Sequence, residues 1–371
     1  MLRYWQAVAD APAYCGGQID FDGLGGMDPL TLRALMPTLI ESGHLRERWP
    51  APTAQTGRFD GIVLHSLGNR FSGAIRPRDG GLTGHTTAAV IFFEDTNLPN
   101  ATAVAEEYAV IIAGSRWNAE VLRAVGIDNV AIVIQGIDRS AFHPAPRSGT
   151  LAGRFAVFSG GKLEYRKAQD LVLLAFRAFA SRHREAVLVT AWHSPWPNVA
   201  ATLNRNSKLT PIALDSEGKV DIATWTATNG LPADQFIDVG SVPNHLMARV
   251  LRETDVALFP NRCEGGTNLV AMECMASGVP TIVSDNTGHK DLVATGAPYV
   301  LNRQKPVAIP DLGTDGWGES EVDEIVEMLE QAWRDRDEAR RRSAAGAAAM
   351  AGWTWTDYTQ RLHETLVPLC Q

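Results

Sequence analysis

The sequence predicts an α/β fold in which two Rossmann-like, doubly wound domains face each other across a cleft. Residues 255–284 have the pattern of a strand, a helix and a second strand, and residues 155–180 have that of a strand, a glycine turn and a helix. Units of this kind close as parallel sheets covered by helices. A chain of 371 residues is also too long for one ordinary core, which favours two domains.

The later unit contains a turn that is suited to an anion. Asp255–Phe259 and Val279–Ser284 are apolar, β-branched runs typical of buried strands, and the apolar residues between them have the spacing of one helical face. Thr267 or Asn268 can cap the start of this helix. A helix start carries roughly half a positive charge, so the turn before it is a candidate phosphate site.

Two carboxylates flank this turn. Glu264 directly precedes Gly265 and Gly266, whose missing Cβ atoms leave the backbone N–H groups open to an anion, and Glu273 lies on the helix. Both carboxylates can therefore face a ligand whose phosphate occupies the gap. Because carboxylates accept well from hydroxyl groups, a ribose is a suitable partner. Two ordinary charges at the edge of a strand–helix–strand unit are the alternative interpretation.

The earlier unit brings cations to a second helix start. The chain has only six lysines, and the first two are Lys162 and Lys167, which flank Arg166 in the sequence GGKLEYRKAQD. Such a cluster adds to the positive end of the helix, so it indicates either a bound anion or a solvated surface cluster.

The two motifs together resemble those of the group 1 glycosyltransferases, which are retaining enzymes with the GT-B fold. Glu264 and Glu273 resemble the family's Glu-x7-Glu signature, although eight residues rather than seven separate them here. Lys162 and Lys167 are similar to the family's Arg-x4-Lys pair, with Lys162 in the place of the arginine. Ala168 stands where the family has a glycine. The resemblance extends from about residue 105 to residue 300.

The resemblance implies an activity and a set of site residues. We expect a sugar to move from a nucleoside diphosphate sugar to a hydroxyl acceptor with retention, in a hexosyl-type transfer without a metal or another cofactor, as in glycan or glycoconjugate biosynthesis. The expected catalytic residues are Lys162, Lys167, Glu264 and Asp95. The expected donor-binding residues are Gly25, Gly26, Arg166, Gly265, Gly266, Thr267, Asn268, Leu269 and Glu273.

The resemblance also divides the chain. We expect an acceptor domain over residues 1–146, a donor domain over 147–352, and a terminal helix over about 353–371 that crosses back to the first domain. A segment rich in Pro, Gly and Ser after residue 134 looks like the hinge. Residues 192–235 lack a clear periodicity and look like an insertion, which either shapes the acceptor side or covers the sheet.

The N-terminal third carries weaker signals. Residues 59–66 and 87–93 read as buried strands, and ligands gather beyond the carboxyl ends of such strands. Glu94 and Asp95 follow the second strand, where many family members have a histidine. A contact with the acceptor hydroxyl and a capping role are equally plausible for these acids. The glycine-rich stretch that contains Gly25 and Gly26 is similar to the family's donor-phosphate loop.

Composition excludes several other classes of protein. The net charge of −8 implies no basic face for nucleic acid. No apolar run is as long as the ~18 residues of a membrane span, and no signal peptide is apparent, so we expect a cytoplasmic protein. The four cysteines lack zinc spacing and suit a reducing compartment, and burial is the expected role of Cys263 and Cys274.

Three alternatives to a glycosyltransferase stay open. A glycoside phosphorylase or a sugar-nucleotide epimerase could use the same two-domain plan, because fold does not determine the reaction. A non-catalytic protein that binds nucleotide sugars or glycans is the third alternative, favoured by the acids at residues 94 and 95. The donor base, the donor sugar and the acceptor are not identified by any short motif.

Overall fold

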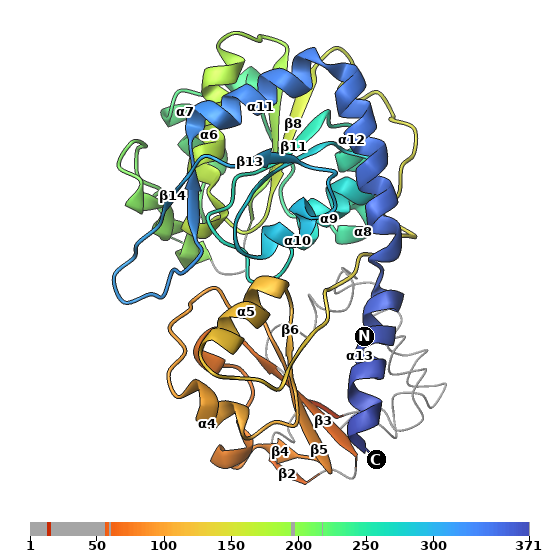
Figure 1. Cartoon of the computed structure of the whole chain (residues 1–371). Helices are drawn as coiled ribbons and strands as arrows, with labels where there is room; N and C mark the ends of the chain where they lie inside the picture. Colours follow the sequence, from red (N-terminus) through yellow and green to blue (C-terminus); the bar gives the residue numbers. More distant parts are fainter. Residues whose placement is uncertain (1–12, 16–55, 59–60, 194–196, 217, 371) are drawn as a thin grey trace.

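The computed structural model describes residues 13–15, 56–58, 61–193, 197–216 and 218–370. Two lobes stacked one above the other contain these residues, and two long helices near the C-terminus run along one side of both (Figure 1). Each lobe has a parallel sheet at its centre. The described part of the chain is therefore mixed α/β with the expected GT-B plan.

The sheet of the C-terminal lobe has six parallel strands in the order typical of dinucleotide-binding folds. From one edge to the other they are β10 (Phe236–Asp238), β9 (Ala186–Ala191), β8 (Phe155–Gly160), β11 (Val256–Phe259), β12 (Thr281–Ser284) and β13 (Tyr299–Leu301). From β8 the chain adds strands first on one side (β9, β10) and then on the other (β11, β12, β13), so the loops after β8 and β11 lead away from each other. Ligands of doubly wound sheets bind at such a switch point.

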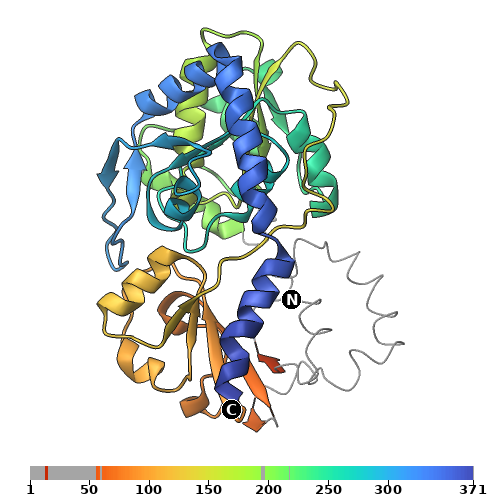
Figure 2. The same cartoon turned by 45° about the vertical axis from the view of Figure 1, so that its right-hand side comes forward.

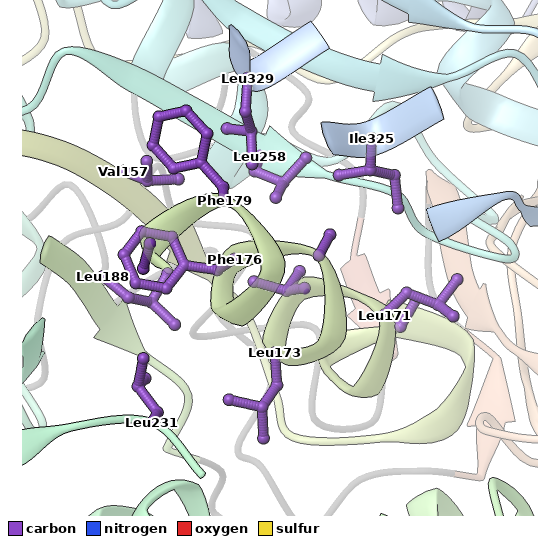
Figure 3. Close-up of a cluster of buried hydrophobic side chains, with 14 of the residues drawn as sticks. Val157, Leu171, Leu173, Phe176, Phe179, Leu188, Leu231, Leu258, Ile325 and Leu329 are labelled. Atoms are coloured by element: carbon purple, nitrogen blue, oxygen red, sulfur yellow. The ribbon is translucent and has the colours of Figure 1, made fainter. Parts of the chain in front are cut away.

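Helices cover both faces of this sheet because its strands are apolar throughout. On one face, α6 (Gln169–Ala180) and α11 (Val322–Arg334) pack together over β8, β9 and β11. Figure 3 shows Phe176 and Phe179 of α6 beside Leu329 of α11 in this core. On the other face lie α8 (Asn244–Arg252), α9 (Leu269–Ala276) and α12 (Arg336–Ala349).

The N-terminal lobe is built around a five-stranded parallel sheet. Its order is β1 (Ala13–Cys15), β3 (Ile62–Leu67), β5 (Thr86–Ile91), β6 (Ile111–Ala113) and β7 (Val130–Ile132). Helices α4 (Ala101–Ala105) and α5 (Arg116–Ala124) pack against one face. The short strands β2 (Gly57–Arg58) and β4 (Leu82–Thr83) pair beside it. Gly25 and Gly26 lie outside the described residues.

The chain crosses between the lobes twice, and the two crossings lie side by side. After β7 it passes through Ile137, whose N–H donates to the carbonyl of Trp353 in the returning segment at 3.0 Å. Helix α13 (Trp355–Leu366) then follows α12 down to the first lobe (Figure 2). It begins with a capping box of Thr354 and Asp357 and packs on the open face of the N-terminal sheet.

The described residues of the segment 192–235 pack into the C-terminal lobe. They form the connection from β9 to β10 and contain α7 (Ile222–Thr228). Leu203, Ile222 and Trp225 are buried in the core beneath α6. The segment therefore helps to cover the sheet, which is one of the two roles expected for it, and its description as an insertion stays a prediction.

A long loop of the C-terminal lobe reaches down to the N-terminal lobe. It joins β14 (Gln304–Pro306) to β15 (Gly318–Ser320) and is visible in Figure 1 as the extension beside β14. We call residues 307–317 of this loop the strap. Helix α10 (Lys290–Val293) also belongs to the C-terminal lobe, and it contacts α5 of the N-terminal lobe. Among the helices that the structure describes, none has the length and apolar character needed to cross a bilayer.

Candidate functional site

The candidate site lies at the carboxyl ends of β8 and β11, the switch point of the C-terminal sheet. The loop after β8 carries Lys162, Arg166 and Lys167, and the loop after β11 carries Glu264 and the two glycines. Backbone hydrogen bonds join the loops, because the N–H of Arg262 donates to the carbonyl of Arg166 at 2.7 Å. The two sequence motifs, about a hundred residues apart, are thus one structure.

Glu264 lies buried at the centre of this site and is surrounded by positive charge. Its carboxylate contacts Lys167 Nζ at 2.5 Å and Arg166 Nη1 at 3.1 Å, and it also accepts from the amide of Asn261. Burial opposes the charged form, but the charges of Lys167 and Arg166 outweigh it and hold the pKa of Glu264 at about 2. Glu264 is therefore ionised throughout the neutral range.

Arg166 connects the two lobes. Besides Glu264, its guanidinium contacts Glu164 at 2.8 Å and Glu94 of the N-terminal lobe at 3.4 Å. Lys167, its neighbour, is 11% exposed, and burial lowers its pKa although Glu264 opposes the shift. The two cations are thus nearly enclosed at the junction of the lobes, where a bound anion would interact with them strongly.

A buried ion pair that the motif search missed supports both loops. Arg262 is fully buried and forms two parallel hydrogen bonds with Asp170 at the start of α6, at 2.8 and 2.7 Å. Its Nη1 also donates to the carbonyl of Tyr165 at 2.7 Å, and its guanidinium stacks 3.8 Å from the Tyr165 ring. The pair therefore fixes the turn that carries Arg166 and Lys167.

Glu273 lies on the first two turns of α9 in contrasting surroundings. It is buried, and among the described residues its carboxylate has a single hydrogen-bond partner, Asn244 at the start of α8, at 3.0 Å. Burial raises the pKa of Glu273 to about 7, and the bond from Asn244 opposes that rise. Among the residues that the structure describes, no cation forms an ion pair with this carboxylate as Lys167 does with Glu264.

The turn between these carboxylates is shaped by close backbone contacts. A Cβ atom on Gly265 would lie 2.6 Å from the carbonyl oxygen of Phe93, so glycine is required where the N-terminal lobe approaches. Asn268 caps α9, because its side chain accepts from the N–H of Ala271 at 3.4 Å. Asn268 is therefore the cap, and Thr267, the other expected cap, donates its hydroxyl to the Met272 sulfur instead.

The remaining predicted residues of the C-terminal lobe flank this arrangement. Gly266 and Leu269 are partly exposed on either side of the helix start. Lys162 is 37% exposed and lies 3.8 Å from Glu164, in a pocket of about 250 Å³ that is also lined by Arg166. Its catalytic role stays a prediction.

Asp95 is engaged by groups of both lobes. It is 3% exposed, and one oxygen accepts from Arg70 Nε at 2.6 Å. The other accepts from the N–H groups of Asn97 at 2.9 Å and Gly313 at 2.8 Å. The carboxylate thus anchors the strap to the N-terminal lobe, and its contact with an acceptor stays a prediction.

Further interlobe bonds lie around the turn. Ser115 Oγ donates to the carbonyl of Gly265 at 2.7 Å, and Asp291 accepts from both the N–H and the guanidinium of Arg116 at 2.9 Å. Ser115 was detectable as a helix cap, whereas no local pattern marked Asp291. Among the described residues, no group of three or more His, Cys, Asp or Glu side chains is arranged to hold a metal ion.

Comparison with known proteins finds glycosyltransferases that are similar to this chain. The profile of the family 4 glycosyltransferases in conflict systems matches residues 243–362, which include Glu264 and Glu273. A GDP-mannose-dependent alpha-(1-6)-phosphatidylinositol dimannoside mannosyltransferase of Mycobacterium tuberculosis is 26% identical over 298 residues. That alignment covers 77% of this chain and 63% of the relative, so the chain spans less than two thirds of the relative's length.

Solved structures resemble the fold over most of the chain. Sucrose-phosphate synthase of Thermosynechococcus elongatus superposes with a TM-score of 0.60 at 14% identity, covering 93% of this chain and 80% of that one. Trehalose 6-phosphate synthase of Burkholderia multivorans gives 0.59 at 15% identity, with 83% and 71% covered. The Anabaena protein HepE in complex with UDP-glucose gives 0.55 at 14%, with 76% and 72% covered.

The fold and the site define a GT-B protein whose donor-type lobe carries a paired cation and carboxylate at the switch point. The chain is similar in sequence to family 4 glycosyltransferases in conflict systems over residues 243–362, and to the mannosyltransferase relative over 77% of its length, in agreement with the resemblance of its motifs to the group 1 glycosyltransferases.

Proposed function

We propose that the protein transfers a sugar from a nucleoside diphosphate sugar to a hydroxyl acceptor, with retention of anomeric configuration and without a metal ion. The observation that carries the proposal is the cluster of Lys167, Arg166 and Glu264 at the switch point of a Rossmann-type sheet, beside the start of α9. Two nearly enclosed cations next to a helix start form a suitable environment for a diphosphate leaving group.

The transfer is largely electrostatic in this proposal. As the bond from the sugar to the diphosphate breaks, negative charge grows on the β-phosphate. Lys167 and the N–H groups at the start of α9 would stabilise that charge, because they are held in place before the reaction begins. Arg166 would add the same stabilisation if the diphosphate replaced Glu94 or Glu164 as its partner.

Glu264 and Glu273 have separate roles in this proposal. Glu264, ionised and bonded to Lys167, would hold that lysine in place and lie beside the donor sugar. Glu273 would accept from the ribose hydroxyls of the nucleotide. A carboxylate that is buried beside one amide partner gains most from such donors, because they favour its charged form.

A screen of donors tests the proposal. Purified protein is mixed with UDP, GDP and ADP sugars, and the unfolding temperature is measured, since a ligand of the native state raises stability by RT ln(1 + [L]/Kd). The stabilising donor is then incubated with hydroxyl acceptors in the presence of a chelator, and the anomeric configuration of the product is read by NMR. An inverted product would contradict retention, and loss of turnover with the chelator would contradict metal independence.

The same experiment separates the other candidate activities. A binding protein without catalysis would be stabilised by a donor but would leave it intact. An epimerase would return a changed nucleotide sugar with no acceptor product. A pyridoxal-dependent phosphorylase would show the absorbance of that cofactor in the purified protein. If no nucleotide sugar stabilises the protein and none is consumed, the proposed function is wrong.

A further inference from the structure

The pocket that Lys162 and Arg166 line lies between the lobes, beside the cluster around Glu264. Its volume is about 250 Å³, and its walls come from the ends of β3 and β5, the turn after β8, the segment that follows β9, and the strap. Arg166 belongs both to this pocket and to the cluster around Glu264, so the two sites share a wall. Pockets for drug-sized ligands hold ~300–1,000 Å³, which limits the occupant here to about one sugar ring.

The strap closes this pocket through bonds to the N-terminal lobe. Thr96 forms two hydrogen bonds with the strap. Its backbone N–H donates to the carbonyl of Gly313 at 3.0 Å, and its hydroxyl donates to the carboxylate of Asp315 at 2.7 Å. Trp317 Nε1 donates to the carbonyl of Glu94 at 2.9 Å. Leu312 and Trp317 of the strap line the pocket, and they pack in one hydrophobic cluster with Tyr165.

The charges that line the pocket are balanced. Three carboxylates and three cations contribute to its wall, namely Glu94, Asp95 and Glu164 with Lys162, Arg166 and Arg205. Most already form ion pairs with one another or with Arg70. An anion would be repelled by the carboxylates and a cation by the basic groups, so charge complementarity favours a neutral ligand.

One wall residue has an acceptor that a hydroxyl group would satisfy. Glu164 is 8% exposed, and its Oε1 is buried without a hydrogen bond of normal geometry among the described residues, although Arg166 lies 2.8 Å away. The ion pair with Arg166 compensates the charge of this oxygen, and its capacity to accept a well-aligned hydrogen bond remains. Sugar hydroxyls can donate to this oxygen and accept from the neighbouring cations, because a hydroxyl does both.

We propose that this pocket binds one neutral, polyhydroxylated ring of the acceptor, and that the strap determines which ring fits. The identification of this ligand as the acceptor rests on the proposed function. The binding itself depends only on the pocket. Leu312 is therefore a specificity-determining residue, since it lines the pocket from the strap but does not belong to the donor cluster.

A matched pair of variants tests this. Leu312→Trp fills the pocket, whereas Leu312→Met conserves the volume. Binding of methyl α-glucopyranoside, methyl α-mannopyranoside and myo-inositol is measured by NMR titration, with glucose 6-phosphate as the charged comparison. Binding of UDP, GDP and ADP is measured by calorimetry on the same proteins. Circular dichroism shows whether each variant keeps the native fold.

We expect at least one neutral probe to bind the wild-type protein and Leu312→Met equally. Leu312→Trp should bind it at least about tenfold more weakly, with nucleotide affinity unchanged within about twofold. Equal binding to Leu312→Trp, tighter binding of the phosphorylated sugar, or no binding of any neutral probe by the wild type would overturn the proposal. If the wild-type protein binds none of the three nucleotides, that result would instead count against the proposed function.

Discussion

Glu264 and Glu273 flank the same turn, but their surroundings are opposite. Glu264 lies against Lys167 and Arg166, and its pKa is held at about 2. Glu273 has one amide partner, and burial raises its pKa to about 7. The first carboxylate is already neutralised by the protein, and the second has a single amide donor among the described residues. This difference is the basis of our proposal that one carboxylate organises the site while the other accepts from a ligand.

The largest change in stability is expected from breaking the buried ion pair of Arg262 and Asp170, which supports the loops around Glu264. Arg262→Ala leaves Asp170 buried without its partner, so the free energy of unfolding should fall by about 3–5 kcal/mol. Urea unfolding measures this change. Arg262→Lys is the control, since it keeps the charge but loses the two parallel bonds, and it should cost less. Equal stability of Arg262→Ala and the wild type would show that the pair is not needed to hold the loops.

Lys167→Ala should come next. Loss of one preorganised contact to a developing charge costs ~3 kcal/mol, so turnover of the donor should fall about a hundredfold or more. Turnover is followed with the donor found in the stability screen, and the far-ultraviolet circular dichroism shows whether the fold is kept. Near-normal turnover by a folded Lys167→Ala would remove this lysine from the catalytic group.

Replacing each glutamate by glutamine should change the free energy of unfolding in opposite directions. Glu264 has a depressed pKa, so its ionised form stabilises the fold above the ordinary pKa of a glutamate, and that stability is lost as the pH falls toward 2. Glu273 has a raised pKa, so its stabilising effect is present at acidic pH and lost as the pH rises through 7.

At pH 8, Glu264→Gln should therefore destabilise the free protein and Glu273→Gln should stabilise it, each by up to about 3 kcal/mol. Chemical unfolding of both variants and of the wild type at pH 8 measures the difference. The gain for Glu273→Gln should shrink when the experiment is repeated at pH 5. A shift of the same sign in both variants would contradict the contrast between their surroundings.

The smallest effect concerns the backbone next to Lys167. Ala168 has φ of 60° and is fully buried, a conformation that costs a non-glycine residue about 1–2 kcal/mol. Ala168→Gly removes that strain but makes the unfolded chain more flexible, so we expect a net gain of at most about 1 kcal/mol. Ala168→Val should be strongly destabilising. A valine that is tolerated would show that the turn adapts.

The sequence predicted the parts of the site that short patterns describe. The strands, the start of α9 and the positions of Lys167 and Glu273 follow from periodicity, capping and the family motifs. These features are local, because a helix start or a strand end is specified by residues within a few positions. The turn length at Glu264 did not prevent that residue from meeting Lys167.

The parts that were missed depend on contacts between distant segments. Arg262 and Asp170 are 92 positions apart, and Asp95 and Gly313 are 218 apart. Neither pair has a spacing that a local pattern could reveal. A charged Arg262 three residues after the end of an apolar strand was a hint, since such a residue needs a partner when it is buried. The strap had no signal, because its fold depends on the lobe that it contacts.

The ribose role of Glu273 is the central claim, and proton release on nucleotide binding tests it most directly. Calorimetry at pH 7 in buffers of different ionisation enthalpy measures the protons released when the preferred nucleoside diphosphate binds. If ribose hydroxyls donate to Glu273, its pKa of about 7 must fall, and the wild type should release more protons than Glu273→Gln. The variant also corrects for titration of the phosphate itself. Equal proton release and equal affinity in both proteins would contradict the account.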